Sequence, residues 1–316
     1  MTGRRALGAV LAGGSGLAMA AQARVNGELA DRLADGLAAA VISFGSGLVL
    51  LTVLVPLTAR GRRGLRAVRA ALRAGQLRWW HLLGGLCGGF VVATQGLTVA
   101  TLGVAVFTVA LVAGQSASGL AVDRVGLGPG GAEPVTAARM GGAVLCVLAV
   151  LIALADRLDA PRALGLAALP LLAGFGVAFQ QAVNGRVRVA AGGSAWPATF
   201  VNFTAGTAAL LVAYAVGVAV RGWPDGALPA EPWLYAGGLL GVVVIATAVL
   251  VVQVTGVLVL GLSAIAGNVT GALLLDLAIP TAGRPEPHTY AGAALTLVAV
   301  AVAGFAGRTP ARVPAG

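Results

Sequence analysis

Long runs without aspartate, glutamate or arginine divide this chain, and they constrain its fold more than any other feature. A helix needs about 20 apolar residues to cross a bilayer. Continuous apolar runs, unlike alternating ones, favour helices over a closed barrel. The sequence therefore predicts an all-α membrane protein with ten transmembrane helices, near residues 6–26, 37–58, 80–100, 103–122, 138–155, 163–184, 195–220, 233–252, 255–275 and 288–307.

Two of these boundaries depend on length alone. The third and fourth spans share one unbroken stretch, which we divide near Thr101-Leu102-Gly103, and the eighth and ninth share another, divided near Thr255-Gly256. About 40 apolar residues are too many for a single span. Only 10% of the residues are charged, against about a quarter in soluble domains. This composition excludes a disordered chain or a disulfide scaffold and argues strongly against a water-soluble enzyme.

The formal charge of +10 comes from arginine, because the chain contains no lysine. Arginines gather in the segments between apolar runs, where they set orientation by the positive-inside rule. With ten spans, 15 arginines fall on the side of both termini and 6 on the other. Both termini are therefore expected in the cytoplasm, and no nucleic-acid partner is expected. The segment 60–78, with seven arginines, could also bind anionic lipid headgroups.

The first residues resemble a signal peptide, with Arg4 and Arg5 before an apolar stretch and Ala18-Met19-Ala20 resembling a cleavage site. We expect no cleavage, because the segment that begins at Gly16 has a counterpart later in the chain.

An internal repeat relates the two parts of the sequence. Residues 16–27 and 174–185 share the frame G-x-x-x-A-x-Q-x-x-V-N-G, and Ser43-Phe44 matches Asn202-Phe203. Residues 79–123 align with 232–276 without a gap, with 17 identities in 45 positions. Membrane composition alone would give about five or six. The sequence therefore divides into two five-helix repeats, 1–157 and 158–316.

Five is an odd number, so the two repeats are expected to enter the membrane in opposite directions. The arginine distribution agrees: the segment between the second and third spans has seven arginines, while its counterpart between the seventh and eighth has one. Inverted-topology repeats are an architecture of secondary transporters. Two equivalent halves can open a site to either side of the membrane by exchanging conformations.

Amide side chains are the main polar groups inside the predicted spans, where ionisable residues are almost absent. Gln22 with Asn26, and Gln180 with Asn184, have i,i+4 spacing and so share one helix face. The repeat adds Ser43 and Asn202 at matched positions. We interpret this set as gating groups or as polar contacts between helices.

Nearer the expected midplane, Gln115 and Asn268 occupy matched positions in the two repeats. Thr108, Gln115 and Ser118 fall on one stripe of their helix. We interpret Gln115, Asn268, Thr108 and Ser118 as candidate groups for binding a polar solute. The alternative is that these side chains only hydrogen-bond neighbouring helices.

Asp123 and Asp276 end the fourth and ninth predicted spans, on opposite faces of the membrane. A carboxylate at a helix carboxyl end opposes the helix dipole. Each is therefore expected to be held by an amide, an arginine or a helix amino terminus, as a structural clasp or as a proton-coupling group. Cys87 and Cys146 lie inside apolar runs without metal-ligand spacing, so neither a metal nor a cofactor is predicted.

Five plus five helices with a repeated Q-x-x-x-N frame resemble the drug/metabolite transporter superfamily, and within it the YdcZ-type branch. The resemblance covers nearly the whole chain and implies an inverted-repeat bundle in the cytoplasmic membrane that moves small organic solutes. Small multidrug exporters of the superfamily carry a carboxylate within the first helix, which residues 6–23 lack. The resemblance is carried by Gln22, Asn26, Ser43-Phe44, Gln115, Asp123, Gln180, Asn184, Asn202-Phe203, Asn268 and Asp276.

The leading hypothesis for function is a secondary transporter that works by alternating access, with membrane lipid and a small-molecule substrate as partners. A binding or assembly protein, or a lipid flippase, is the alternative. Gly13-Gly14-Ser15-Gly16 resembles the serine motif of intramembrane proteases. A serine hydrolase is the weakest hypothesis, because His81 and His288 lie at span ends, far from Ser15 along the membrane normal. Monomer and homodimer both remain open.

Overall fold

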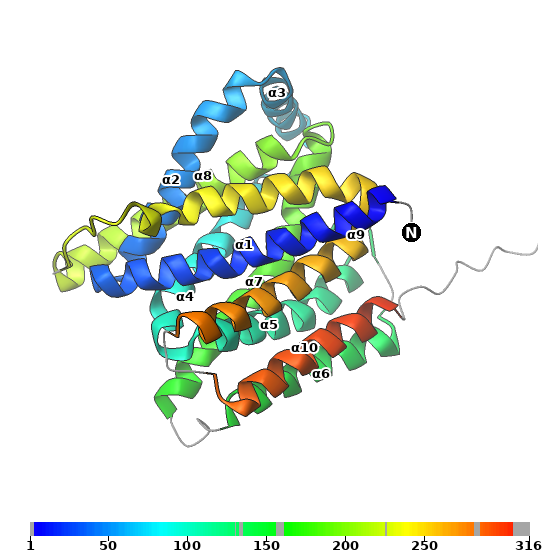
Figure 1. The fold of residues 1–316 in the computed structure, drawn as a ribbon. Coiled ribbons are helices and arrows are strands. Elements are labelled where there is room, and N and C mark those ends of the chain that lie inside the picture. Colours follow the sequence, from blue (N-terminus) through cyan, green and yellow to red (C-terminus); the bar gives the residue numbers. More distant parts are fainter. Residues whose placement is uncertain are drawn as a thin grey trace, which may run out of the picture.

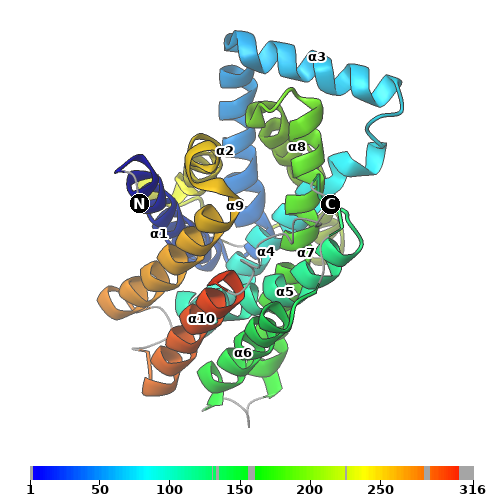
Figure 2. The same ribbon diagram turned by 90° about the vertical axis from the view of Figure 1, so that its right-hand side faces the viewer.

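The computed structural model describes residues 3–129, 131–132, 135–155, 161–224, 226–280 and 285–305, and within these ranges it contains helices and no strand. Figures 1 and 2 show the helices packed as one bundle, with α3 lying across the end of α2. The helices are α1 Gly3–Leu33, α2 Gly36–Leu57, α3 Ala59–Arg73, η1 Trp79–Leu83, α4 Gly84–Leu102, α5 Val104–Arg124, α6 Ala137–Ala153, α7 Pro161–Ala190, α8 Ala195–Arg221, η3 Pro232–Tyr235, α9 Gly237–Ala278 and α10 Pro287–Phe305.

Six of the described helical stretches are long and apolar enough to cross a membrane. Shorter apolar helices span Ala137–Ala153, Ser263–Ala278 and Pro287–Val302. All of these stretches overlap spans predicted from hydropathy, because apolar runs in lipid must satisfy their backbone groups as helices. The six long stretches are Ala6–Leu33, Gly36–Leu57, Trp79–Leu102, Val104–Arg124, Leu164–Ala190 and Ala195–Arg221.

Local signals place several helix ends. Asp35 caps α2, where its carboxylate accepts the backbone N–H groups of Leu37 and Ala38 at 2.7 and 2.9 Å. Such a cap satisfies two of the four free N–H groups of a helix start. Gly103 separates α4 from α5 with a φ of 81°, a conformation that favours glycine. The break predicted at Thr101-Leu102-Gly103 is therefore present.

The second predicted break, near Thr255-Gly256, is not matched by the helix bounds. The backbone remains helical through Gly256, and α9 is one element of 42 residues. At about 1.5 Å per residue a straight helix of that length would measure about 63 Å, twice a bilayer core. Unlike at Gly103, the backbone at Gly256 itself is helical.

The two ends of α9 nevertheless run in opposite directions along α1. A methyl group added at Gly237 or Gly241 would meet Asn26 or Gln22, so residue numbers rise on α9 as they fall on α1. One added at Gly267 or Gly271 would meet Gly13 or Leu17, so here the numbers rise together. Figures 1 and 2 show the helix turning back between these arms.

Glycines allow the two halves to approach closely at equivalent places. A methyl group at Gly16 would lie 2.0 Å from the Ala264 carbonyl oxygen, and one at Gly174 would lie 2.1 Å from the Leu111 carbonyl oxygen. Gly16 and Gly174 are repeat partners, as are Leu111 and Ala264. Both contacts join residues that the sequence alignment pairs, and both use small residues as membrane helices do.

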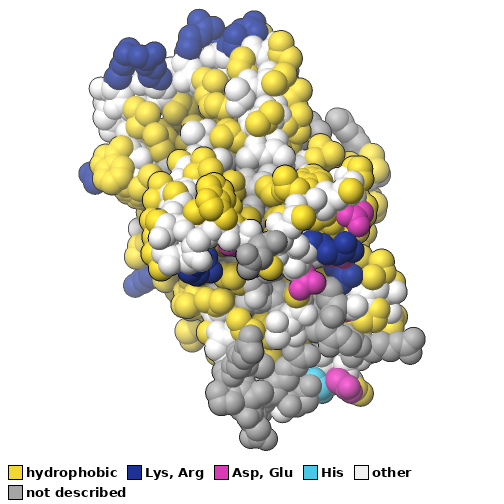
Figure 3. Space-filling model, turned by 90° about the vertical axis from the view of Figure 1, so that its left-hand side faces the viewer, with side chains coloured by type: hydrophobic (Ala, Val, Ile, Leu, Met, Phe, Trp, Pro, Cys, Tyr) yellow, Lys and Arg dark blue, Asp and Glu magenta, His cyan; other side chains and the backbone are white. Residues whose placement is uncertain are grey.

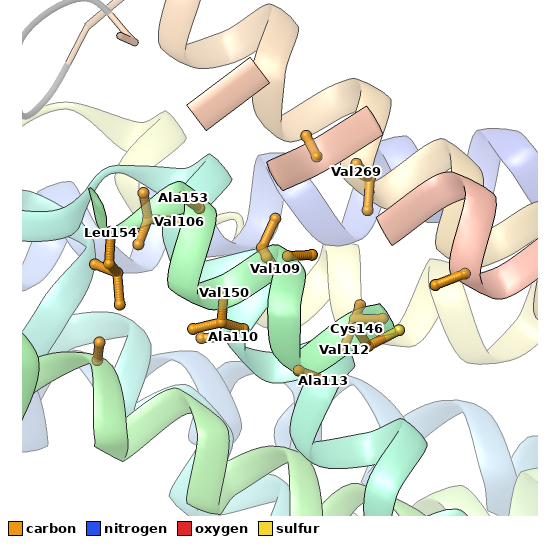
Figure 4. Close-up of a cluster of buried hydrophobic side chains, with 14 of the residues drawn as sticks. Val106, Val109, Ala110, Val112, Ala113, Cys146, Val150, Ala153, Leu154 and Val269 are labelled. Atoms are coloured by element: carbon orange, nitrogen blue, oxygen red, sulfur yellow. The ribbon is translucent and has the colours of Figure 1, made fainter. Parts of the chain in front are cut away.

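The largest apolar cluster of the described residues lies mainly between α5, α6, α10 and the second arm of α9, with Leu102 of α4 and Ala167 of α7. Figure 4 shows Val109 and Ala110 of α5 facing Cys146 and Val150 of α6, with Val269 above them. This cluster joins α6 and α10 to the rest of the bundle.

Candidate functional site

A cavity of about 280 Å³ lies where the two halves meet, and its described lining comes from α1, α2, α4, α5, α7, α8 and α9. Part of the wall is apolar, including Phe44, Phe107 and Phe203. The rest is unusually rich in amides. The polar lining residues are Gln22, Gln95, Thr108, Gln115, Gln180, Gln181, Asn202 and Asn268.

The amides of the second half form a closed cluster at one side of this cavity. The side-chain amide nitrogens of Gln180 and Asn184 both donate to Asn202 Oδ1, each at 2.9 Å. The i,i+4 spacing on α7 aims both groups at the same point of α8. These three residues, predicted as gating groups or helix–helix contacts, therefore tie α7 to α8.

Their counterparts in the first half are arranged differently. Gln22 Nε2 donates to the Gly237 carbonyl oxygen at 3.0 Å, and Asn26 Nδ2 donates to Gln95 Oε1 at 2.7 Å. Ser43 stands where the second half has Asn202, and its hydroxyl is too short to take over that residue's two acceptor bonds. Asn26 Oδ1 and Ser43 Oγ are both buried without a hydrogen-bond partner among the described residues.

Two stacked phenylalanines join these clusters. The ring centroids of Phe44 on α2 and Phe203 on α8 lie 4.8 Å apart, with 28° between the planes. Gly47 and Gly206 make room for them, because a methyl group at either would lie 2.3 Å from the opposite ring. The repeated Ser-Phe and Asn-Phe pairs therefore build one wall of the cavity from both halves.

Three of the four candidate binding residues line the cavity with side chains that can still accept or donate hydrogen bonds. No hydrogen bond is recorded for the side chains of Gln115, Asn268 or Thr108 among the described residues. Asn268 is only 6% exposed, yet its amide is not among the fully buried, unpaired polar atoms of the described residues, because it faces the cavity. Ser118, the fourth candidate, donates to the Gln115 carbonyl oxygen at 3.4 Å and is absent from the described lining.

Gln95 and Gln181 are cavity residues that the repeat analysis did not single out. Neither has an amide at the equivalent position in the other half, so the symmetry used to select candidates gave no signal for them. Gln95 is an amide inside an otherwise apolar run, and that fact alone was the available signal.

The two predicted carboxylates are held by different groups. Asp276 is buried at the end of α9 and accepts the backbone N–H groups of Val104 and Ala105 at 3.1 and 2.7 Å, at the amino terminus of α5. Asp123, near the end of α5, forms an ion pair with Arg139 of α6. A helix amino terminus and an arginine are two of the three partners expected.

A second cavity of about 390 Å³ adjoins the first and shares Gln115, Gln181 and Ile265 with it. Its wall includes the Asp123–Arg139 pair. The two cavities together connect the centre of the bundle with the ends of α5 and α6.

Ser15 and His81, two residues of the serine hydrolase hypothesis, make local hydrogen bonds. The Ser15 hydroxyl donates to the Ala12 carbonyl oxygen of its own helix at 2.8 Å, and His81 Nδ1 accepts the Arg78 backbone N–H at 3.1 Å. No cluster of three or more His, Cys, Asp or Glu side chains that could hold a metal ion occurs among these residues.

Comparison with known proteins gives one match. The model of a family described as "DMT_YdcZ: Putative inner membrane exporter, YdcZ" matches residues 7–152 and 165–302, one segment in each half. No curated protein and no solved structure matches the chain.

Proposed function

The chain belongs to this YdcZ family of inner membrane exporters, and from that premise we propose that it is a secondary transporter that moves a small organic solute by alternating access. It is a multi-pass protein of the inner membrane with a transporter role. The substrate and the mechanism are the parts that we propose here.

The observation that carries the proposal is the pairing state of the amides. Of the described lining amides, Gln22, Gln95, Gln180 and Asn202 bond to another amide or to backbone. The side chains of Gln115 and Asn268, contributed by opposite halves, face the cavity without a hydrogen-bond partner among the described residues. A purely structural polar contact would be expected to have its partner in place. Unpaired amides that converge on a cavity are typical of a ligand site.

We further propose that the two halves are inverted repeats with five spans each, the two arms of α9 counting as two spans. The matched contacts of Gly16 and Gly174 support a two-fold relation between the halves. Because the halves can exchange conformations, such a relation gives a transporter an inward-open and an outward-open state of similar energy. The site then lies at the interface of the repeats.

The arginine distribution orients the proposed cycle. It assigns both termini, Arg124 and Arg139 to the cytoplasmic side. The second cavity, with Arg139 in its wall, would then lead from the central cavity toward the cytoplasm. In this conformation the solute would be accepted from inside the cell, as export requires.

Transport in sealed proteoliposomes tests the proposal. A panel of radiolabelled solutes would be assayed with and without a pH gradient, for the wild type, Gln115→Ala and Asn268→Ala. We expect both substitutions to reduce flux by about tenfold or more, since each removes a hydrogen-bonding group of the solute site. Thr204→Ala is the matched control, because Thr204 is exposed and its hydroxyl bonds within α8.

Full activity of both alanine variants would contradict the central site. Flux of phospholipid across the bilayer, without flux of any soluble solute, would favour the flippase alternative.

A further inference from the structure

The described wall of the central cavity carries no charged side chain, and this bears on its ligand. None of its described lining residues is Asp, Glu, Arg or His. The two long apolar runs that frame it, 82–122 and 236–275, contain none of these residues either. A charged solute would therefore lose its hydration without gaining a counter-ion, which costs a great deal in a membrane interior.

From this observation, and resting on the proposed function, we infer that the cavity binds an uncharged organic solute that carries both hydrogen-bond donors and acceptors. Each amide side chain offers two donor hydrogens and an acceptor oxygen. The side chains of Gln115 and Asn268 have no hydrogen-bond partner in the part of the chain that the structure describes, and Thr108 adds a hydroxyl on the same stripe as Gln115. A carboxamide or alcohol group satisfies all three without a net charge.

The remaining wall limits the rest of the solute. Phe44 and Phe203 are stacked on each other, and Phe107 is also part of the apolar lining. A volume of about 280 Å³ lies at the lower end of the range for small-molecule sites. The preferred solute is therefore small, with one polar edge and one flat apolar face.

Binding of matched aromatic probes to the purified protein in nanodiscs tests this inference. Benzamide, benzoate and benzylammonium have similar shapes but differ in charge. We expect benzamide to bind about 100-fold more tightly than either ion, because the ions lack a counter-charge. Asn268→Leu should abolish benzamide binding, and Gln115→Glu should raise the affinity for benzylammonium relative to benzamide.

Binding separates this inference from the proposed function. Benzamide binding without flux of any solute would overturn the transporter and leave the cavity assignment intact. Equal or tighter binding of either ion, or no binding of benzamide by the wild type, would overturn the inference, even if some charged solute were transported.

A different observation carries a second inference, at α3. One face of this helix packs against α8 and the end of α7 through Gly64, Val68 and Ala71. The other face exposes six arginines and no acidic residue. They are Arg60, Arg62, Arg63, Arg66, Arg69 and Arg73.

Few acidic side chains lie near these arginines in the sequence or pair with them in the described part of the chain. Residues 36–122 contain no aspartate or glutamate, and no ion pair joins an α3 arginine to another residue in the described ranges. Arg62 is partly used, since it donates to the Pro56 and Leu57 carbonyl oxygens at the end of α2. Figure 3 shows arginine atoms gathered along the top edge, where Figures 1 and 2 place α3.

The geometry points to the phosphate headgroups of anionic phospholipids as the partner of this face. An amphipathic helix that lies across the end of a spanning helix sits at headgroup depth. Each arginine there is attracted to an anionic surface. Trp79, 71% exposed shortly after α3, is of the type that anchors in the same layer.

Lipid retention in mild detergent tests this second inference. Four arginines that make no capping bond would be replaced together by Gln (R60Q, R63Q, R69Q and R73Q) or, as the matched control, by Lys. Native mass spectrometry would count phosphatidylglycerol and phosphatidylcholine bound to each protein. We expect the wild type and the Lys variant to retain phosphatidylglycerol selectively, and the Gln variant to lose that selectivity. Equal selectivity in all three, or tighter binding of a short RNA than of phosphatidylglycerol, would overturn it.

Discussion

Asp276 and Asp123 occupy equivalent positions of the sequence repeat, yet they bind different partners. Asp276 is 4% exposed and caps the start of α5, directly after the break at Gly103. The Asp123 side chain is 39% exposed and pairs with Arg139, while the backbone at Gly256, the partner of Gly103, stays helical. A capping carboxylate therefore accompanies a break at a glycine of positive φ, and an ion-paired one accompanies a helix that turns back through helical backbone.

This difference shows that residues at equivalent positions of the sequence repeat can have different partners and different backbone conformations nearby. Under the proposed mechanism the two halves exchange conformations, so one structure would show them unequal at their hinges. Equivalent contacts that persist in both halves, such as those of Gly16 and Gly174, then mark the rigid parts of the cycle.

The largest expected effect is all-or-none and concerns the inversion itself. Asp31 and Val189 are exposed and occupy equivalent positions after the Q-x-x-x-N frames. In a variant with Cys87 and Cys146 replaced by alanine, D31C and V189C should react with a membrane-impermeant maleimide from opposite sides of intact cells. Labelling from the same side would end the comparison, because the halves would then not be inverted.

The next effect concerns the shared close contacts. Gly16→Ala and Gly174→Ala each place a methyl group about 2 Å from a backbone oxygen, and overpacking against backbone costs about 3 kcal/mol. We expect similar large falls in the thermal unfolding midpoint for both. Gly14→Ala and Gly165→Ala on the same helices are the controls, since a methyl group at either meets nothing within 4 Å. A fall in only one of the tested pair would show that the two contacts are not equivalent.

The third effect is the difference in stability loss between substitutions of the two carboxylates. Asp276→Ala removes two charge-assisted bonds to a helix start, which we expect to cost about 2 kcal/mol. Asp123→Ala removes a partly exposed ion pair, worth about 0–1 kcal/mol. Unfolding of the two variants in the same detergent, monitored by scanning fluorimetry, measures the difference. Equal losses would argue that Asp123 is also a cap in the dominant conformation.

The smallest contrast lies in the amide clusters. Asn202→Ala leaves the Gln180 and Asn184 amides without their acceptor and should cost about 1–3 kcal/mol. Ser43→Ala removes a buried hydroxyl that has no partner, so we expect a change within about 0.5 kcal/mol or a slight gain in stability. The same fluorimetric comparison measures both. A loss at Ser43 as large as that at Asn202 would indicate that the hydroxyl has a partner in solution.

The sequence by itself determined the helical class and the positions of most spans. Lipid leaves apolar runs only internally bonded structures, so hydropathy alone predicts α2 and α5 to within two residues. The repeat likewise selected Gln115 and Asn268, which both line the central cavity.

Tertiary structure decided which polar groups are paired and which are free. The Asn26–Gln95 bond joins residues 69 positions apart, and the Asp276 cap joins residues more than 170 apart. Such bonds depend on the approach of helices, which local periodicity does not encode. The path of α9 and the packing of α3 depend on the approach of helices in the same way. Similar apolar patterns are compatible with a break at a glycine and with a helix that turns back, and packing against neighbouring helices determines which of the two forms.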